Sequence, residues 1–414
     1  MAKKMNKIEK LIDKLCPDGV EFKEINAITK DKFWIMPATP KFNASEKIPY
    51  ITSKNIRGGH IDFTKVKYIS RSDYLNLSRN RPILEGDILI SMIGTIGEVA
   101  RVKKTDLDFY GQNMYLIRLD EKLLNSGYFL HYFDSKGMKE HFNTVKNKSS
   151  QGYLKARDIE TLKIPIPPLA IQKEIVKILD NFTKLEAELE AELEARKKQY
   201  EYYRDELLSI KNVEYKTLGE IGILIRGNGL QKKDFRETGV GCIHYGQIYT
   251  YYGTFASKTK SFVSQESARK FKKAQKGDVL VSGVSENVED ICKPLGWLGD
   301  EICISGDMFS FRHNQNTKFI TYILQTTNFQ RYKKRFAQGT KVIRVKKDKI
   351  LDFKIPIPPI AEQKRIVAIL DKFDALVNDI STGLPAELEA RRKQYEYYRE
   401  KLLTFKPLEK QNVN

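Results

Sequence analysis

The run Lys163–Phe182 reads KIPIPPLAIQKEIVKILDNF, and it is repeated at Lys354–Phe373 as KIPIPPIAEQKRIVAILDKF. The two runs are identical at 15 of 20 positions and lie 191 residues apart. Each is followed by a second repeated run, AELEARKKQYEYYRDELL at Ala191–Leu208 and AELEARRKQYEYYREKLL at Ala386–Leu403. A tandem repeat of this size indicates two similar modules joined by similar spacers.

The repeated runs have the pattern of long helices. Ile164–Pro168 is predicted to be an extended leader, because proline lacks an N–H donor and the residue before a proline avoids the helical region. Apolar residues then recur at heptad spacing, which predicts an unbroken helix from Ala170 to Leu208. In the second copy, Gly383 and Pro385 are expected to break the helix before Ala386. The predicted seam of the first copy consists of Ile171, Ile175, Ile178, Phe182, Leu185, Leu189, Tyr200, Tyr203 and Leu207.

The segments that precede the two spacers read as short strands and turns. Gly86–Ser91 (GDILIS) matches Gly277–Ser282 (GDVLVS), whereas the loops that follow these two strands differ strongly. A helix is predicted at Ser126–Val145, with a counterpart at Phe319–Phe336. A short helix over residues 5–15 is expected to open the chain. The framework is therefore shared between the halves and the loops are not.

Together these patterns predict an α+β fold. Two similar mixed α/β domains are separated by two long helices, which we expect to form an antiparallel coiled coil with pseudo-two-fold symmetry. The predicted segments are an N-terminal helix and turn (1–19), a first mixed domain (20–162), a first spacer helix (163–211), a second mixed domain (212–353), a second spacer helix (354–408) and a tail (409–414).

The composition favours a nucleic-acid partner. The 414 residues include 72 Lys+Arg against 53 Asp+Glu, for a formal net charge of +19. A protein this basic usually binds a polyanion. No apolar run reaches the length of a membrane span, and the start of the chain does not resemble a secretory signal. The four cysteines, Cys16, Cys242, Cys292 and Cys303, form no CxxC pair, which fits a reducing cytoplasm and argues against a structural zinc.

The sequence contains no recognisable catalytic or metal-binding constellation. There is no GxxxxGK[ST] phosphate loop, and the only Pro-Pro pairs lie in the two leaders. We therefore predict no catalytic residue and no metal site in this chain. Basic and amide side chains in loops are the remaining signal, since Arg, Asn and Gln read base edges and Lys and Ser bind phosphates. The candidate DNA-binding residues are Lys54, Asn55, Arg57, Arg79, Arg81, Gln112, Asn113, Lys148, Ser150, Gln151, Tyr245, Gln247, Lys341 and Arg344.

The paired leaders and helices, the paired EAR[KR]KQYEYYR and the GDILIS/GDVLVS strands resemble the specificity (S) subunit of Type I restriction–modification systems. The resemblance covers essentially the whole chain. It implies that the mixed domains are two target recognition domains and that the helices are conserved spacers. It also implies a non-catalytic, cytoplasmic DNA-binding subunit that assembles with two methyltransferase (M) subunits and with restriction (R) subunits. The chain itself would hold no cofactor, and S-adenosylmethionine, ATP and Mg would be bound by the partner subunits.

Residues repeated on the helices beyond the apolar seam are read as a docking surface for the methyltransferase subunits, because Tyr and Arg often anchor interfaces. These residues are Gln172, Lys173, Gln199, Tyr202, Arg204, Gln363, Lys364, Gln394, Tyr397 and Arg399. Three other readings stay open at this point: a self-contained methyltransferase or nuclease, a basic scaffold for RNA or an acidic partner, and a stand-alone bipartite DNA-binding protein without a methylation role.

Overall fold

A computed structural model describes residues 7–94, 96–106, 108–145, 152–379 and 381–408. It divides into two compact units. The first unit comprises Met1–Ala187 and Ala390–Asn414, and the second unit comprises Glu188–Glu389. The border between the units therefore falls inside the first spacer helix, and each unit contains one mixed domain together with part of both spacers. The finer domain limits given above stay a prediction.

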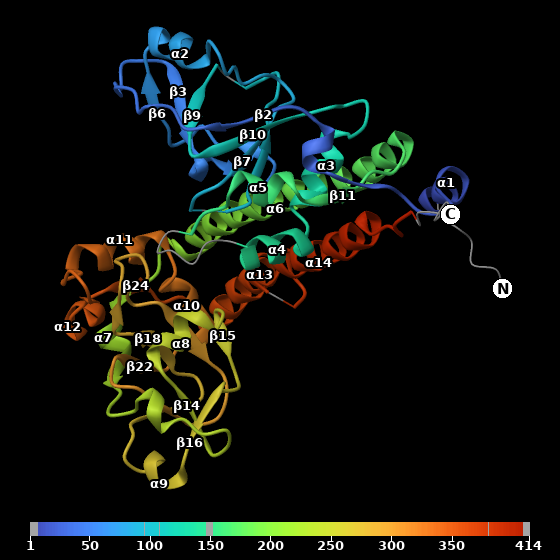
Figure 1. The fold of residues 1–414 in the computed structure, drawn as a ribbon. Helices are drawn as coiled ribbons and strands as arrows, with labels where there is room; N and C mark the ends of the chain where they lie inside the picture. Colours follow the sequence, from blue (N-terminus) through green and yellow to red (C-terminus); the bar gives the residue numbers. More distant parts are fainter. Residues whose placement is uncertain (1–6, 95, 107, 146–151, 380, 409–414) are drawn as a thin grey trace, which may run out of the picture. The chain divides into compact units, whose positions relative to one another are not determined.

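The first unit contains one sheet of four strands and one of three, besides two-stranded pairs (Figure 1). One is antiparallel with the order β2-β10-β7-β8, formed by Thr29–Ile35, Met114–Leu119, Ile88–Ser91 and Val99–Arg101. The other has the order β6-β3-β9, formed by Lys67–Ile69, Ile48–Thr52 and Tyr110–Gln112. In this second sheet β3 and β9 are parallel and β3 and β6 are antiparallel. The predicted strand GDILIS is the buried β7.

The second unit repeats this arrangement with a different set of edge strands. Its larger sheet has the order β13-β22-β18-β20-β15, formed by Gly222–Arg226, Met308–His313, Val279–Ser282, Pro294–Trp297 and Phe255–Ala256. Its smaller sheet has the order β16-β14-β21-β17, formed by Ser261–Val263, Val240–Ile243, Ile302–Ile304 and Lys273–Ala274. Here again the central pair, β14 and β21, is parallel, and β14 pairs with β16 in the antiparallel sense. The α+β class is confirmed.

Each proline-rich leader is a short strand that closes its own domain. In the first unit β11 (Lys163–Pro165) pairs antiparallel with β1 (Phe22–Glu24). In the second unit β24 (Lys354–Pro356) pairs with β12 (Tyr215–Thr217) in the same register. The isoleucine between the lysine and the proline is fully buried in both leaders. The chain thus returns to the start of its domain before it enters a spacer helix.

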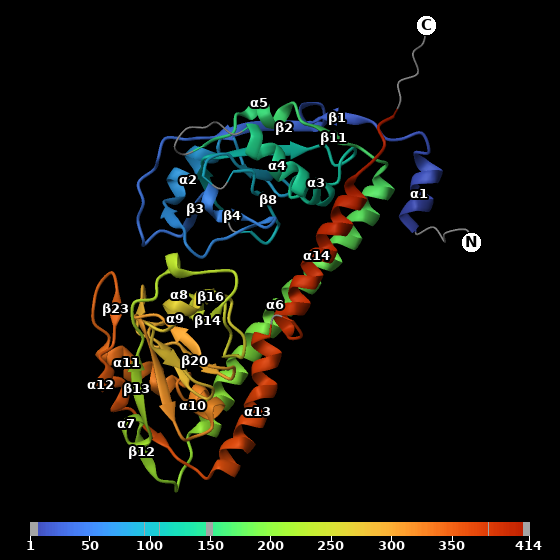
Figure 2. The ribbon, with the colours of Figure 1, turned by 90° about the horizontal axis from the view of Figure 1, so that it is seen from below.

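The first spacer is one continuous helix, α6 (Leu169–Leu208), of 40 residues. In the first unit α6 runs antiparallel to α14 (Leu384–Leu403): the rings of Phe182 and Tyr398 stack at 5.6 Å, and Glu186 pairs with Arg392 at 2.5 Å (Figure 2). In the second unit the later part of α6 lies against α13 (Ile360–Asn378), where Tyr203 stacks on Phe373 at 5.6 Å. The predicted seam of α6 is partly wrong, because Leu185 is exposed whereas Leu179, outside the prediction, is fully buried.

The second spacer is interrupted where the sequence predicts a break. Helix α13 ends at Asn378 and α14 begins at Leu384. A Cβ on Gly383 would lie 2.4 Å from the carbonyl oxygen of Ala375, so only glycine fits at this break.

The single helices predicted after each sheet are each two helices. The structure has α3 (Ser126–Phe133) and α4 (Lys136–Val145) in the first unit, and α10 (Thr317–Ile323) and α11 (Thr327–Phe336) in the second. At the break in the first unit, Asp134 at the end of α3 pairs with Arg399 of α14 at 2.6 Å, and the hydroxyl of Ser135 accepts from the N–H of Met138 in α4 at 3.4 Å. The predicted opening helix is α1 (Lys7–Leu15) within the described residues.

The remaining elements are short. They are η1 (Ile25–Ile28), η2 (Ser53–Asn55), β4 (Ile56–Arg57), β5 (His60–Ile61), α2 (Arg71–Ser78), α5 (Ala156–Glu160), α7 (Leu218–Ile221), η3 (Lys232–Asp234), α8 (Tyr245–Thr250), α9 (Gln265–Ala268), β19 (Val284–Ser285), β23 (Ile343–Arg344) and α12 (Lys347–Leu351). Among the described residues, no helix is long and apolar enough to cross a membrane.

Candidate nucleic-acid interface

A compact turn follows the central parallel strand pair of the first unit. Strands β3 and β9 end side by side, with Thr52 opposite Gln112. The carboxyl ends of parallel strands are a common position for ligand-binding groups. The turn that continues β3 contains Lys54, Asn55 and Arg57, so the structure places these three residues and Gln112 at one edge of one sheet.

Asn55 is not available to a ligand, which corrects its prediction as a DNA contact. Its side chain is buried; Oδ1 accepts from the backbone N–H of Thr52 at 2.9 Å, and Nδ2 donates to the carbonyl of Asp62 at 2.9 Å. The Asn55 amide therefore connects the two ends of the turn, at Thr52 and Asp62. An asparagine in a polar loop carries the same sequence signal whether it reads a base or holds the backbone.

Lys54 and Arg57, in contrast, are exposed, and their side chains have no partner within the described part of the chain. Their backbone is firmly held. Gly58 and Gly59 form the tip between β4 and β5 with φ of 57° and 79°, a conformation that favours glycine. Gly59 exchanges two backbone hydrogen bonds with β8, at 3.1 and 3.2 Å. Two cationic side chains thus project from a rigid support.

Gln112 and Asn113 are half-buried at the same edge. The Oε1 of Gln112 accepts from the hydroxyl of Tyr50 at 3.3 Å and from that of Thr39 at 3.2 Å. Burial, with a smaller effect of Tyr110, raises the pKa of Tyr50 to about 12, so this phenol stays a neutral donor. Asn113 has φ of 64°, which asparagine tolerates better than most residues. Both residues serve the turn between β9 and β10.

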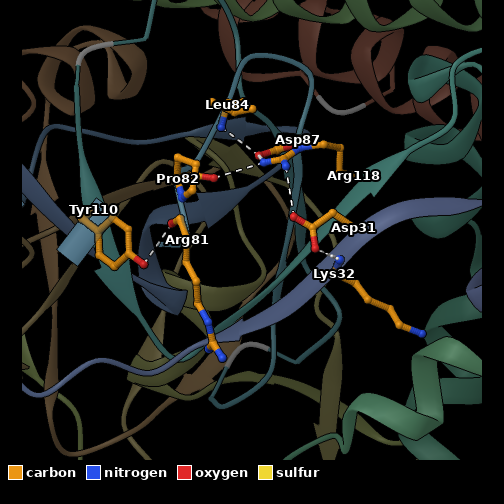
Figure 3. A network of polar contacts seen from close by, with 8 residues as sticks. All are labelled: Asp31, Lys32, Arg81, Pro82, Leu84, Asp87, Tyr110 and Arg118. Carbon is orange, nitrogen blue, oxygen red and sulfur yellow. Dashed lines mark hydrogen bonds and ion pairs between the residues drawn. The ribbon is translucent and has the colours of Figure 1, made fainter. Parts of the chain in front are cut away.

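Arg79 and Arg81 are exposed near the larger sheet of the first unit. The guanidinium of Arg81 donates to the carbonyl of Trp34 at 3.1 Å and lies 5.5 Å from the ring of Phe33. Figure 3 shows this side chain pointing away from the neighbouring pair of Asp87 and Arg118. That pair is a framework contact, with Nε to Oδ1 at 2.8 Å, and the second unit has the same contact between Asp278 and Arg312 at 3.2 Å.

The second unit has a turn at the equivalent place, which begins at His244 after β14. The Oε1 of Gln247 accepts from the backbone N–H of His244 at 2.9 Å, and its Nε2 donates to Ser261 at 2.7 Å. Gln247 is thus used internally, which corrects its prediction as a base-reading residue. Tyr245 is half-buried, with its ring 4.5 Å from that of His244.

Lys341 and Arg344 are exposed on and beside β23, which pairs with β19. Lys148, Ser150 and Gln151 lie outside the described residues. Sequence reasoning missed the exposed Tyr251, whose ring has the ammonium of Lys260 at 4.5 Å. The run YTYY at 249–252 is the signal that could have drawn attention to it. Among the described residues, no group of three or more His, Cys, Asp or Glu side chains could hold a metal ion.

The turn of the second unit is expected to loosen in acid. Burial and then Lys232 lower the pKa of His244, whose neutral ring accepts from the N–H of Gly246 at 3.3 Å. With a lowered pKa in the folded state, the unfolded state binds the proton first, so this stabilisation is present above the ordinary histidine pKa and is lost as pH falls through it. Hydrogen exchange between about pH 7.5 and about pH 5.5, corrected for intrinsic rates, should show lost protection at 245–250 and unchanged protection at 53–57.

The predicted partner surface on the helices divides into an inner and an outer set. Gln172 is fully buried: its Oε1 accepts from the N–H of Asn125 at 2.7 Å, and its Nε2 donates to the carbonyls of Pro167 at 2.7 Å and Leu123 at 3.0 Å. Gln363 is fully buried and makes the matching bonds in the second unit, to Asn316 N–H, Pro358 and Gln315. The surface prediction is wrong for both, because each amide joins a spacer helix to the mixed domain of its own unit.

Arg204 and Arg399 also lie inside the structure, so their prediction as surface residues is wrong as well. Arg204 binds Asp205 through Nε and Nη2, and Arg399 binds Asp134. Their relative exposure is 7% and 5%. The guanidinium of Arg204 lies 5.6 Å from the ring of Tyr200, and that of Arg399 lies 4.9 Å from the ring of Tyr395. Both arginines therefore pack inside their units.

The outer set centres on two tyrosines. Tyr202 and Tyr397 are 64% and 63% exposed. Tyr397 lines a groove between α4 and α14, which also contains Lys136 and Lys401. Tyr202 lines the corresponding groove of the second unit, beside Lys198 and the start of α11. Lys173, Lys364 and Gln394 are exposed, and Gln199 is half-buried and accepts from Arg196.

Comparison with known proteins places this geometry in a family. The model of the Type I restriction modification DNA specificity domain matches twice, at residues 17–195 and 210–390. The chain belongs to the Type I restriction–modification specificity family. The two matches follow the two mixed domains, which are the target recognition domains of this specificity subunit.

Individual relatives of this chain are also specificity subunits of type I restriction enzymes. The chain is 37% identical over 278 residues to the Type I restriction enzyme EcoR124I/EcoR124II specificity subunit of Escherichia coli, covering 64% of this chain and 69% of that one. It is 33% identical to a putative type I restriction enzyme specificity subunit of Haemophilus influenzae, covering 72% and 77%.

Solved structures support the fold. A chain described with the complex assembly and conformational transition of the type I R-M system aligns with a TM-score of 0.61 at 16% identity, covering 94% of this chain and 98% of that one. The S subunit from M. genitalium aligns with a TM-score of 0.51 at 16% identity, covering 93% and 96%.

Proposed function

We propose that this specificity subunit recognises an asymmetric bipartite DNA target, with each recognition domain reading one half-site. The observation that carries the proposal is the pairing of one framework with two different sets of exposed side chains. The turn after β3 presents Lys54 and Arg57, whereas the segment after β14 presents Tyr251 at the end of α8. Two domains of the same construction with different contact residues are suited to two different half-sites.

The spacer helices would set the distance between the half-sites. Half-sites on one face of a duplex lie about one helical turn apart, roughly 10 bp from centre to centre. Half-sites of about 3–5 bp then leave an unread gap of roughly 6 bp. The continuous α6 suits this role, because a helix transmits length without bending at loops. A pseudo-two-fold relation of the two domains would orient them on opposite strands.

The helices would also dock two methyltransferase subunits, and restriction subunits would join through these. Tyr202 and Tyr397 support this proposal, because an exposed tyrosine at the same place in both units fits two copies of one partner. In this scheme the chain itself catalyses no reaction, and S-adenosylmethionine, ATP and Mg belong to the partner subunits.

The decisive experiment maps methylated adenines across the genome of cells that express this chain with the methyltransferase encoded beside it. We expect a new asymmetric, gapped motif that is methylated on both strands and is absent from cells without this chain. If the complex assembles and no new motif appears, the methylation role is wrong and a DNA-binding or scaffold role without methylation takes its place.

Docking at the tyrosines can be tested separately. Replacing Tyr202 and Tyr397 together by alanine is expected to weaken binding of the methyltransferase subunit by about 30-fold or more, as expected for exposed interface anchors. Tyr251→Ala removes a tyrosine of similar exposure from a recognition domain and serves as the control. The affinity is measured by titration of the purified subunits without DNA. Equal affinity of the double variant and the wild type would place the interface elsewhere.

A further inference from the structure

The turns after β3 and β14 occupy the same position in their sheets. Tyr50 of β3 faces Tyr110 on one side and Lys67 on the other. Cys242 of β14 faces Cys303 and Ser261 with the same strand directions. Counting forward from these two residues, Thr52 corresponds to His244, and Asn55 corresponds to Gln247. The hydrogen-bond ladder fixes this alignment, although the two sequences share almost nothing here.

The corresponding amides perform the same task in both turns. Asn55 and Gln247 each accept from the backbone N–H three residues earlier, at 2.9 Å in both cases. Each then donates across the turn, Asn55 to the carbonyl of Asp62 and Gln247 to the hydroxyl of Ser261. The next residue, Ile56 or Ile248, is buried in the domain core. The start of the turn is thus held in the same way in both domains. Beyond the amide the two paths differ, since Ile56 opens strand β4 whereas Ile248 lies within helix α8.

The outward positions of the two turns differ in chemistry. Lys54 corresponds to Gly246. After the amides, Arg57 is exposed on β4, whereas Tyr249, at the same count, is half-buried in α8 and its hydroxyl donates to the carbonyl of Val284 at 2.8 Å. The first turn therefore offers two exposed cations, and the second offers none at these positions. A turn whose start is held by the same bond and whose exposed residues differ has the properties of a reading element.

We propose that these turns are the base-reading elements of the two recognition domains, and this proposal rests on the proposed function. In the first domain Arg57 is the specificity-determining residue and reads a guanine, since the guanidinium matches the two acceptors of guanine in the major groove. Lys54 contacts a phosphate, because its single charged group carries no base information. Asn55 and Gln247 are positioning residues that hold the turns in shape.

The rigid support explains why Arg57 suits this role better than an ordinary surface arginine. Its backbone lies in β4, which pairs with β5, and the glycine tip is bonded to β8. Arg81, in comparison, already donates to Trp34 and lies over Phe33. Because the backbone under Arg57 is already fixed, binding orders only its side chain, whereas Arg81 would first have to give up its contacts with Trp34 and Phe33.

The test maps the methylated motif of Arg57→Ala in the complete complex, with Arg157→Ala as a matched control because Arg157 is an exposed arginine of α5 in the same unit. We expect Arg57→Ala to lose discrimination at one guanine of one half-site by about 5- to 150-fold, with the other half-site unchanged. Lys54→Ala should weaken DNA binding on all sequences alike and leave the motif intact. Arg157→Ala should change neither property.

Asn55→Ala should relax several positions of the same half-site, and Asn55→Asp should restore part of the selectivity, since it keeps the acceptor for the Thr52 N–H. A merely structural role would lower stability without this half-site pattern. If the wild type yields no motif, the proposed function fails. If the wild type yields a motif and Arg57→Ala keeps full discrimination at every position, or weakens binding equally on all sequences, the assignment of Arg57 is overturned.

Discussion

Replacing Gln172 by leucine is expected to lower the free energy of unfolding of the first unit by about 2–4 kcal/mol. Leucine is similar in size, so the loss comes from hydrogen bonding and not from a cavity. The substitution leaves the N–H of Asn125 and the carbonyls of Leu123 and Pro167 without their partner; the bond to Pro167 is buried and the other two are partly buried. A buried backbone group without a partner costs about 1–3 kcal/mol. Gln363→Leu should have the same effect on the second unit.

The measurement is denaturant unfolding of the full chain, read by hydrogen exchange so that each unit is followed by its own amides. Lys173→Ala and Lys364→Ala are the matched controls, since they alter the exposed neighbours of the two glutamines and should change stability by less than about 0.5 kcal/mol. A Gln172→Leu variant as stable as its control would mean that Gln172 is not an essential connection between helix and domain.

The repeat allowed the spacers to be predicted closely and their inner faces poorly. Proline in the leaders, the apolar period and Gly383 are local signals, and they correctly predicted α6 and the break between α13 and α14. A residue that is identical in the two repeats, however, can serve either a surface or an internal contact, and the sequence does not distinguish these. Gln172 and Arg399 are polar and repeated, which suggested a surface, but they are kept for contacts inside each unit.

The recognition domains show the opposite balance. Their two turns begin with the same backbone-to-amide hydrogen bond, at Thr52 and His244, although their sequences are nearly unrelated. The pairing of distant strands fixes where this bond forms. Asn55 and Gln247 were identified as important for the wrong reason, since only the structure reveals that both amides point inward. The contact of Asp134 with Arg399, 265 residues away, likewise cannot be read from a local pattern.

Shortening α6 by one turn within Ala187–Leu193 is expected to change the gap of the DNA motif and to leave both half-sites as they are. Deleting four residues removes about 6 Å of helix, which corresponds to about one or two base pairs. The segment lies at the border of the two units, so each recognition domain keeps its own framework. The second spacer is interrupted, since α13 ends at Asn378 and α14 begins at Leu384, and we expect this break to take up the change in length.

The length of α6, and not the charge of this segment, should determine the gap of the DNA motif. A variant with Glu188→Ala and Glu190→Ala keeps the length of α6 and removes two negative charges from the same segment. It should methylate the wild-type motif. Both variants are read by mapping methylated adenines in cells with the neighbouring methyltransferase. A deletion variant that methylates the wild-type motif with its original gap would refute the role of the helices as a spacer of fixed length. A changed gap together with altered bases would instead show that the recognition domains depend on this part of α6.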